Sequence, residues 1–380
     1  MNCTLTLPPG LSPFARPLAI LASIGAVLVL LCLGLWPFHA PSNAVAWLAN
    51  SDGVRFGDYG TIMSVGTIDA PPSTEPSCSI EIWLQAARVN NEGTILQFYA
   101  PNQPARFSLH QSDADLTLES GMGKRPLQSQ GIRIYLDDAL RHTPLLLVTV
   151  TSGPQGTSAY LNGSLRKIAP QFRLAPNDCS GRLIVGDSAL QQDTWQGDVR
   201  GVAVYSTELS TSAVLRHYQA WIQSGTPQPA PNERPAALYL FDEHSGSIVH
   251  NRAGSAPDLT IPATYTVLDQ IFLEPFWQEF NFSWGYWKNA IKNVVGFVPL
   301  GFVFYAYFSL LGRTRRATLI VVLIGFAVSL TIEVTQAFLP TRDSGTTDLI
   351  TNTFGTWIGV LAFRALKLPP PLRSWLGIAP

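Results

Sequence analysis

Charged residues are scarce in this sequence, and those that occur are balanced in sign. Only 13% of the 380 residues are Asp, Glu, Lys or Arg, and the formal net charge is −1. A chain without an excess of positive charge has no general electrostatic attraction to nucleic acid or to anionic lipid. We therefore expect no nucleic-acid partner.

The sequence also lacks the short motifs that mark common catalytic and metal sites. It contains no His-Glu-x-x-His pattern, no Cys-x-x-Cys pair, no nucleophile elbow and no phosphate-binding loop. All six histidines lie at or before His250, ahead of the last three apolar runs. A histidine-based site within those runs is therefore excluded.

Cysteine is rare as well, with four residues in the chain. Cys78 and Cys179 both fall in the part that lacks long apolar runs. If that part lies outside the cytoplasm, an oxidising environment permits a disulfide between them. Two separate thiols are the alternative, and the sequence leaves both open.

Long apolar runs are present. The first, Leu18–Trp36, carries no charge and is bounded by Pro17 and Pro37. At about 1.5 Å per residue, such a run can cross a bilayer of about 30 Å as a helix. We predict a retained transmembrane helix at 17–37 rather than a cleaved signal peptide, because no small-residue cleavage pattern follows. Three further transmembrane helices are predicted at about 293–311, 317–339 and 347–366.

Between the first and second runs the pattern changes to short strands. Over residues 42–265, runs of alternating apolar and polar residues are separated by turn residues, which is typical of an antiparallel sandwich. Asn162-Gly163 predicts a hairpin turn, and a proline-rich linker lies near 223–235. The predicted fold is an all-β jelly-roll sandwich plus an α-helical bundle of four transmembrane helices.

Several motifs in this region carry a resemblance to a known fold family: Ser79–Leu84, Ala159–Gly163, Leu183–Asp187 and Trp195–Ser210. In this order they resemble a laminin-G-like, concanavalin A-type jelly roll. The resemblance implies binding of carbohydrate or protein, in some members with Ca²⁺. Asp187 and Asp198 are then weak candidates for Ca²⁺ or ligand contacts at loop ends, and ordinary turn residues are the alternative.

A segment rich in aromatic residues, about 270–290, precedes the second apolar run. Tryptophan and tyrosine favour the boundary between membrane and water, because their rings are partly apolar and partly polar. We predict an interfacial segment here, and an aromatic core of a soluble domain is the alternative.

Basic residues predict the orientation in the membrane, because short cytoplasmic loops are enriched in Lys and Arg. They lie before the first run, between the second and third, and after the fourth: Arg16, Arg313, Arg315, Arg316, Arg364, Lys367 and Arg373. With four spans, all of these positions fall on one side. We predict a multi-pass protein of the cell (inner or plasma) membrane, with cytoplasmic termini (1–16 and 367–380) and residues 38–292 outside the cytoplasm.

This topology brings polar residues of the last three runs near the outer leaflet. Such residues are costly in hydrocarbon and therefore mark a site. The predicted binding cluster is Asn293, Glu333, Gln336, Arg342, Asp348 and Asn352. The spacings Glu333–Gln336 and Asp348–Asn352 place each pair on one helix face.

The order of these residues, with Phe297, Pro299, Gly301 and Gly355 among them, resembles the VanZ-like membrane family over about 288–366. The first predicted helix would then be the first of four VanZ-like helices. The name of the family comes from glycopeptide (teicoplanin) resistance, and the resemblance implies a link to that phenotype.

We expect a non-enzymatic protein of the cell envelope whose outer domain binds a glycan, peptidoglycan or an envelope protein, while the helices contact the lipid bilayer. One alternative is a membrane enzyme that acts on lipid-linked or peptidoglycan substrates, with Glu333 and Asp348 as catalytic acid and base. The other is a structural or protein-interaction module, in which the cluster forms interhelical hydrogen bonds and Arg342 serves as counter-ion.

Overall fold

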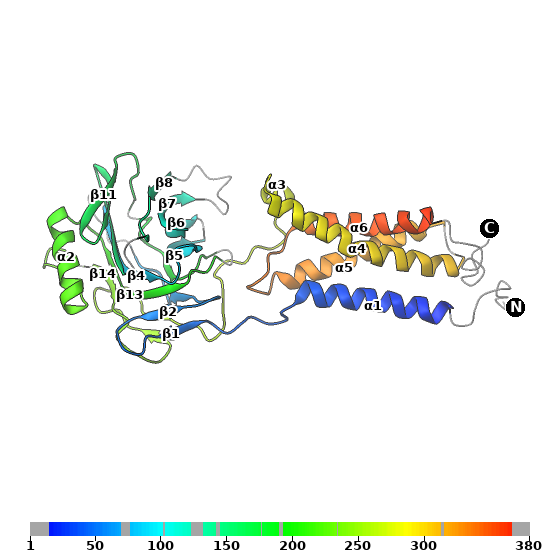
Figure 1. Cartoon of the computed structure of the whole chain (residues 1–380), viewed down its shortest axis with the longest axis horizontal. Helices are drawn as coiled ribbons and strands as arrows, with labels where there is room; N and C mark the ends of the chain where they lie inside the picture. The colour runs from blue at the N-terminus through cyan, green and yellow to red at the C-terminus, as the bar shows by residue number, and fades with distance from the viewer. Residues whose placement is uncertain are drawn as a thin grey trace. The chain divides into compact units, whose positions relative to one another are not determined.

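The computed structural model describes residues 15–69, 77–101, 103–122, 132–141, 145–175, 177–189, 193–233, 235–312 and 315–366. Most of the predicted cytoplasmic ends lies outside these residues, as do Arg313, Lys367 and Arg373. The chain forms two compact units. The sandwich unit runs from Ala40 to Gln270, and the helical unit combines the segment up to His39 with the segment from Ile271 onward (Figure 1).

The first sheet of the sandwich unit has eight strands, and all its strand pairs are antiparallel. Its order is β1-β2-β13-β4-β9-β10-β11, with β14 also paired to β13. The strands are β1 (Val45–Trp47), β2 (Val54–Phe56), β13 (Gly197–Tyr205), β4 (Cys78–Ala86), β9 (Leu146–Gly153), β10 (Gly156–Leu161), β11 (Ser164–Ala169) and β14 (Pro235–Tyr239).

The second sheet also has eight antiparallel strands, in the order β15-β16-β3-β12-β5-β6-β7-β8. The strands are β15 (Ile248–Val249), β16 (Leu259–Thr260), β3 (Ile62–Ser64), β12 (Arg182–Val185), β5 (Glu92–Ala100), β6 (Gln103–Ser112), β7 (Asp115–Met122) and β8 (Ile132–Leu136). The predicted jelly-roll sandwich is thus confirmed.

The core lies between the two sheets and follows from the period-two pattern of the strands. In the second sheet, Leu96, Leu109, Leu118 and Ile134 are register partners across β5 to β8, and all are buried. Because side chains alternate between faces along a strand, the residues between them point away from the core. One continuous apolar cluster joins both sheets.

The helix α2 (Thr211–Ser224) covers the outer face of the first sheet (Figure 1). Its N-cap is Ser210, whose hydroxyl accepts a hydrogen bond from the Ala213 backbone N–H at 3.3 Å. Gly225 ends the helix in the left-handed conformation. Beneath it, Trp221 and Val214 pack with Tyr205 of the sheet, so the part of the sheet under α2 is buried on both faces.

Local features of the sandwich follow from turn chemistry. Asn162 and Gly163 both have positive φ (51° and 76°) and join β10 to β11, as predicted for a hairpin. After the proline-rich segment, β14 pairs with β13 and completes the sandwich. Cys78 and Cys179 form a disulfide bond.

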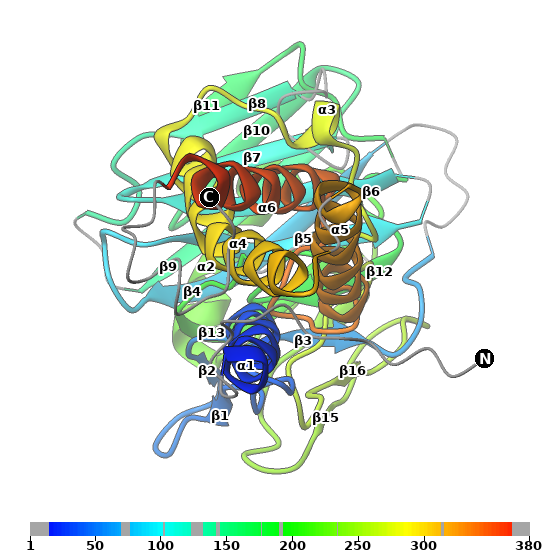
Figure 2. The same ribbon diagram turned by 90° about the vertical axis from the view of Figure 1, so that its right-hand side faces the viewer.

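The helical unit contains four long helices and one short one. They are α1 (Ala15–Leu35), α3 (Phe276–Glu279), α4 (Trp284–Leu310), α5 (Ala317–Gln336) and α6 (Thr346–Ala365). Figure 2, which looks along the long helices, shows α4 between α6 and α1. The predicted interfacial segment forms the short helix α3 and the beginning of α4, which starts about two and a half turns before the predicted position.

Three of the described helices are long and apolar enough to cross a bilayer: α1 (from Arg16), α4 and α5. The helix α6 has the same length as α5 but carries polar Thr347, Asn352 and Thr356 on its buried face. Its opposite face exposes Ile350, Phe354, Trp357 and Leu361. Because apolar residues face outward and polar residues face the neighbouring helices, we treat α6 as the fourth span.

Candidate functional site

The helices α5 and α6 meet through facing polar residues near one end of the helical unit. Asn352 Nδ2 on α6 donates to Ser329 Oγ on α5 at 3.0 Å. One turn further along α5, Glu333 Oε2 accepts a hydrogen bond from the Gly345 backbone N–H at 2.9 Å. Since residues four apart share a helix face, Ser329 and Glu333 line up opposite Asn352 and Asp348.

Glu333 is the most deeply buried acid of this end, with 1% of its surface exposed. Among the described residues, its hydrogen-bond partner is the N-cap residue of α6, Gly345. The carboxylate therefore lies at the positive end of the helix dipole. It also interacts electrostatically with Asp348 and Glu279, so three carboxylates share this end of the unit.

Asp348 connects the site to α4. Its carboxylate is hydrogen-bonded to the Asn293 side chain, and it interacts electrostatically with Glu279. Asp348 is partly buried, in contrast to Glu333. Asn293, Glu333, Asp348 and Asn352 thus converge from α4, α5 and α6.

Glu279, on the short helix α3, belongs to this cluster but was not among the predicted residues. Its Oε2 accepts a hydrogen bond from the Thr347 backbone N–H at 2.8 Å. The α3 segment is held there by backbone hydrogen bonds of Glu274 to Ser344 and Thr346. A carboxylate in the middle of an exposed aromatic stretch was the signal that could have identified it.

Gln336 and Arg342 do not join the other four residues. Gln336 Nε2 donates to the Gly34 carbonyl at 2.8 Å, and Arg342 Nη2 donates to the Trp36 carbonyl. Both therefore bind carbonyls at the C-terminal end of α1. The idea of Arg342 as counter-ion to the carboxylates is wrong, because its guanidinium is held at the end of another helix.

Within the described ranges, the carboxylates of this cluster lack a basic partner. Among the described residues, no Lys, Arg or His forms an ion pair with Glu279, Glu333 or Asp348. Two backbone N–H groups of α6 and its dipole offset part of the charge of any carboxylate that ionises. Neighbouring carboxylates in such a setting hold a proton or attract a cation.

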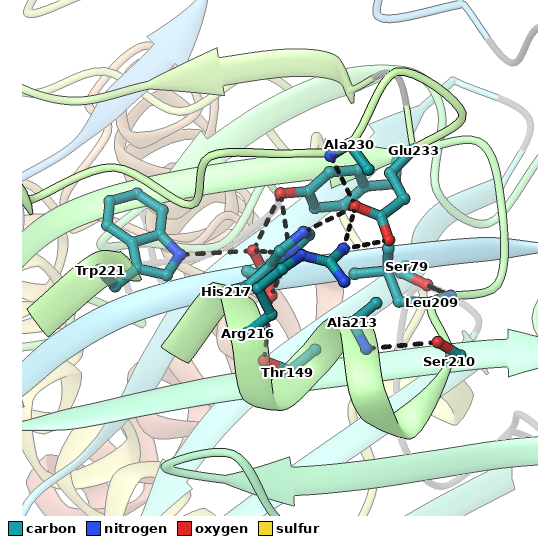
Figure 3. Close-up of polar contacts among 12 residues, drawn as sticks. Ser79, Thr149, Leu209, Ser210, Ala213, Arg216, His217, Trp221, Ala230 and Glu233 are labelled. Carbon is teal, nitrogen blue, oxygen red and sulfur yellow. Dashed lines mark hydrogen bonds and ion pairs between the residues drawn. The ribbon is translucent and has the colours of Figure 1, made fainter. Parts of the chain in front are cut away.

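The sandwich unit holds a second polar network, beneath α2 (Figure 3). His217 of α2 places Nδ1 3.2 Å from Glu81 Oε1 and Nε2 3.1 Å from Glu233 Oε2. Glu81, on β4, is fully buried and also accepts hydrogen bonds from the Tyr205 hydroxyl at 2.9 Å and the Trp221 Nε1 at 3.3 Å. The network connects α2 to the sheet.

Hydrogen bonds outweigh burial at His217 and Glu233 in this network. Burial opposes protonation of His217, but the hydrogen bonds to Glu81 and Glu233 outweigh it and raise the pKa of His217. Burial likewise opposes ionisation of Glu233, yet the hydrogen bonds from Arg216 and other donors lower its pKa to about 2. Every group is satisfied by protein partners, which indicates a structural role for the network.

The outer face of the second sheet offers a different surface. Its outward residues form two rows of register partners, here called the polar face: Thr94, His110, Thr117 and Tyr135, and Gln97, Ser108, Glu119 and Arg133. Arg133 pairs with Glu119 at 2.7 Å, and His110 pairs with Asp193 at 3.4 Å. Arg133 and Tyr135 are exposed, His110 and Glu119 are half-buried, and Thr94, Gln97, Ser108 and Thr117 are buried.

The predicted calcium contacts are not arranged as a site. Asp198 lies within β13 and forms two hydrogen bonds with Arg55, at 2.7 and 2.8 Å. Asp187 is fully buried, and its Oδ1 accepts from the Ser188 and Asp193 backbone N–H groups. Ca²⁺ takes six to eight oxygen ligands, and no metal-binding group of three or more His, Cys, Asp or Glu occurs in the described ranges. These residues therefore do not fit the ion.

Comparison with family models assigns both parts of the chain. Residues 236–367 match the VanZ/LLP1 family, and residues 58–215 match the concanavalin A-like lectin/glucanases superfamily. The first match begins at β14, within the sandwich unit, and continues through α6. No curated protein matches the chain.

Among solved structures, the chain is similar to three binding proteins. A proposed carbohydrate-binding protein from Bacteroides ovatus is 14% identical, with 60% of this chain and 61% of that chain covered and a TM-score of 0.37. The ligand-binding domain of botulinum neurotoxin serotype D, in complex with N-acetylneuraminic acid, is 13% identical over 57% and 62%, with a TM-score of 0.33. The binding domain of Paraclostridial Mosquitocidal Protein 1 is 14% identical over 48% and 47%, with a TM-score of 0.34.

The chain spans about half the length of several of the solved structures it matches, 45% in one case. The family models agree with the sheets and helices described above. The chain is therefore a membrane protein that combines a VanZ-like domain with a laminin-G-like, concanavalin A-like domain.

Proposed function

We propose that this protein is a cell-envelope membrane protein whose sandwich unit lies outside the cytoplasm and binds a glycan through the polar face. The observation that carries the proposal is the polar face itself. The helix of the sandwich unit, α2, covers the first sheet, and no described helix of that unit covers the second. A sheet face that is polar, rather than apolar, is suited to a hydroxyl-rich ligand.

The side chains of this face match the chemistry of a sugar. The exposed Arg133 and Tyr135, with half-buried Glu119 and His110 on the neighbouring strands, supply hydrogen-bond donors and acceptors. The exposed ring of Tyr135 supplies a flat apolar surface with a polar end. Charged side chains that are already paired, Arg133 with Glu119 and His110 with Asp193, leave the face without a strong excess of either sign.

Two observations support the location outside the cytoplasm. The Cys78–Cys179 disulfide is typical of an oxidising compartment. The basic residues Arg315, Arg316 and Arg364 lie at the helix ends opposite to the carboxylate cluster, as the positive-inside rule requires. The VanZ-like domain extends the proposal to glycopeptide resistance, which a drug-susceptibility comparison of cells with and without the protein measures.

A glycan array tests the binding proposal. The purified full chain in neutral detergent is expected to bind a defined envelope glycan saturably, and Tyr135→Ala is expected to weaken binding roughly tenfold, because an aromatic contact is lost. Arg166→Ala, on the exposed strand β11 of the other sheet, serves as the control and leaves binding unchanged. Binding that is absent for every glycan, or equal in both variants, rejects the proposal.

A further inference from the structure

We propose that the carboxylate cluster of the helical unit binds a primary ammonium group, carried by a lipid head group. The site consists of Glu279, Glu333, Asp348 and the side-chain carbonyl of Asn352. It lies outside the sandwich unit, so this inference is independent of the proposed glycan binding. Either proposal, glycan binding or ammonium binding, can be rejected while the other holds.

The first step is the charge. Three carboxylates interact with one another here. Their polar partners in the described part of the chain are two backbone N–H groups at the start of α6 and the Asn293 side chain. Burial and mutual repulsion oppose ionisation of these carboxyl groups, and a positively charged ligand would stabilise their charged forms.

The second step is an unsatisfied acceptor next to the carboxylates. Asn352 is 5% exposed, and its Oδ1 has no hydrogen-bond partner among the described residues. Its Nδ2 is held by Ser329, one turn from Glu333 on α5. Side chains of a helix tilt toward its N-terminus, so the Asn352 side chain is directed toward the end of α6 that carries Asp348 and the other carboxylates. A buried carbonyl oxygen without a donor is costly, and a donor in the site removes that cost.

The third step is the kind of cation. The part of the chain that the structure describes has no group of three acidic residues close enough to hold a metal ion. An ammonium group has three N–H donors and reaches three separate acceptors at about 2.8 Å each. It therefore needs fewer acceptors than the six to eight oxygen ligands of Ca²⁺.

Exposed aromatic residues lie next to Glu279 in the sequence. The same short helix that supplies Glu279 exposes Phe276 and Trp277, which are 47% and 64% exposed, and Trp284 follows with 75%. Aromatic residues of this type lie at the depth of lipid head groups. A head-group ammonium in the cluster would leave its acyl chains beside these rings.

The test uses the purified full chain in neutral maltoside micelles, followed by its thermal unfolding midpoint. We expect octylamine to raise the midpoint saturably, whereas octanol, which has the same chain and no charge, does not. Ethanolamine alone separates the two sources of an ammonium group: a response equal to that of octylamine assigns the site to a free amine, and a weaker one assigns it to a lipid. Native mass spectrometry compares the binding of phosphatidylethanolamine with that of phosphatidylcholine, and preferential binding of phosphatidylethanolamine is expected.

Glu333→Gln and Asp348→Asn are each expected to weaken octylamine binding about tenfold, because a charge-assisted hydrogen bond is lost. If Glu333→Gln does not fold, Glu279→Gln gives the same test at the edge of the site, since it keeps an acceptor for the Thr347 N–H. Glu92→Gln in the sandwich unit is the control. Equal responses to octylamine and octanol, or no effect of these substitutions, overturn the proposal. A change in the unfolding midpoint that a matched change of pH reproduces without octylamine also overturns it.

Discussion

Asp187 shows how one residue couples burial to pH. Its side chain has no exposed surface and is hydrogen-bonded to the Tyr265 side chain. Burial raises the pKa of Asp187 from 3.8 to about 7, despite hydrogen bonds from the Tyr265 side chain and the Ser188 and Asp193 backbones that favour the charged form. Between these two pKa values, the carboxyl group is therefore protonated in the folded sandwich and ionised in the unfolded chain.

This shift predicts a stability that falls with pH. Because the folded pKa lies above the unfolded one, stability is full below about pH 4 and declines as the pH rises to about 7. The difference amounts to about 4 kcal/mol. Asp187→Asn keeps an oxygen acceptor and cannot ionise, so we expect equal stability at pH 4 and a more stable variant at pH 8. Urea unfolding of the sandwich unit, residues 40–270, measures this.

The control for this prediction is Asp113→Asn, at an exposed turn position. It is expected to keep the pH slope of the unchanged protein. An Asp187→Asn variant with the same slope as the unchanged protein would show that Asp187 is ionised in the fold.

At the scale of elements, the packing of α4 against α6 depends on small residues. A Cβ atom on Gly301 would lie 1.9 Å from the Thr356 backbone oxygen, and one on Gly355 would lie 2.2 Å from the Val294 backbone oxygen. These glycines allow the two helix backbones to approach closely, as small residues do between membrane helices. The close approach in turn places Asn293 of α4 beside Asp348 of α6.

Gly301→Ala is therefore expected to lower the thermal stability of the helical unit, by about 1–3 kcal/mol, because the backbones must separate. Gly296→Ala on the same helix is the matched control, since no atom lies within 4 Å of its added Cβ. The control is expected to be neutral or slightly stabilising, because alanine favours a helix over glycine. Equal melting temperatures of the two variants in detergent would contradict this account of the packing.

At the scale of the whole molecule, the order of the segments along the chain constrains the side of the membrane on which the sandwich unit lies. The sandwich unit is inserted between α1 and the remaining helices of the helical unit. Both ends of the insertion therefore lead to the same side of the membrane under the proposed topology. The disulfide and the polar face then belong to one compartment.

Cysteine labelling tests this topology. In a background with Cys3 and Cys32 changed to serine, Ser164→Cys on the exposed strand β11 is expected to react with a membrane-impermeant maleimide in intact cells. Arg315→Cys is expected to react only after the membrane is opened, because the α4–α5 loop would be cytoplasmic. The reverse pattern would place the sandwich unit in the cytoplasm.

The sequence by itself determined the architecture, because its signals are local. Alternating strands, the Asn162-Gly163 turn and the length of the apolar runs each act within a few residues, and the family resemblance agreed with them. The α6 span was the weakest of these signals, since its polar residues face other helices rather than lipid.

Only the tertiary structure decided the membership of the candidate site. Asn293, Glu333, Asp348 and Asn352 come together, whereas Gln336 and Arg342 turn to the end of α1 and Glu279 joins from α3. Spacing along a helix sets which face a side chain occupies. It does not set which neighbouring helix end supplies the hydrogen-bond partner, because that depends on packing between segments that lie far apart in the sequence.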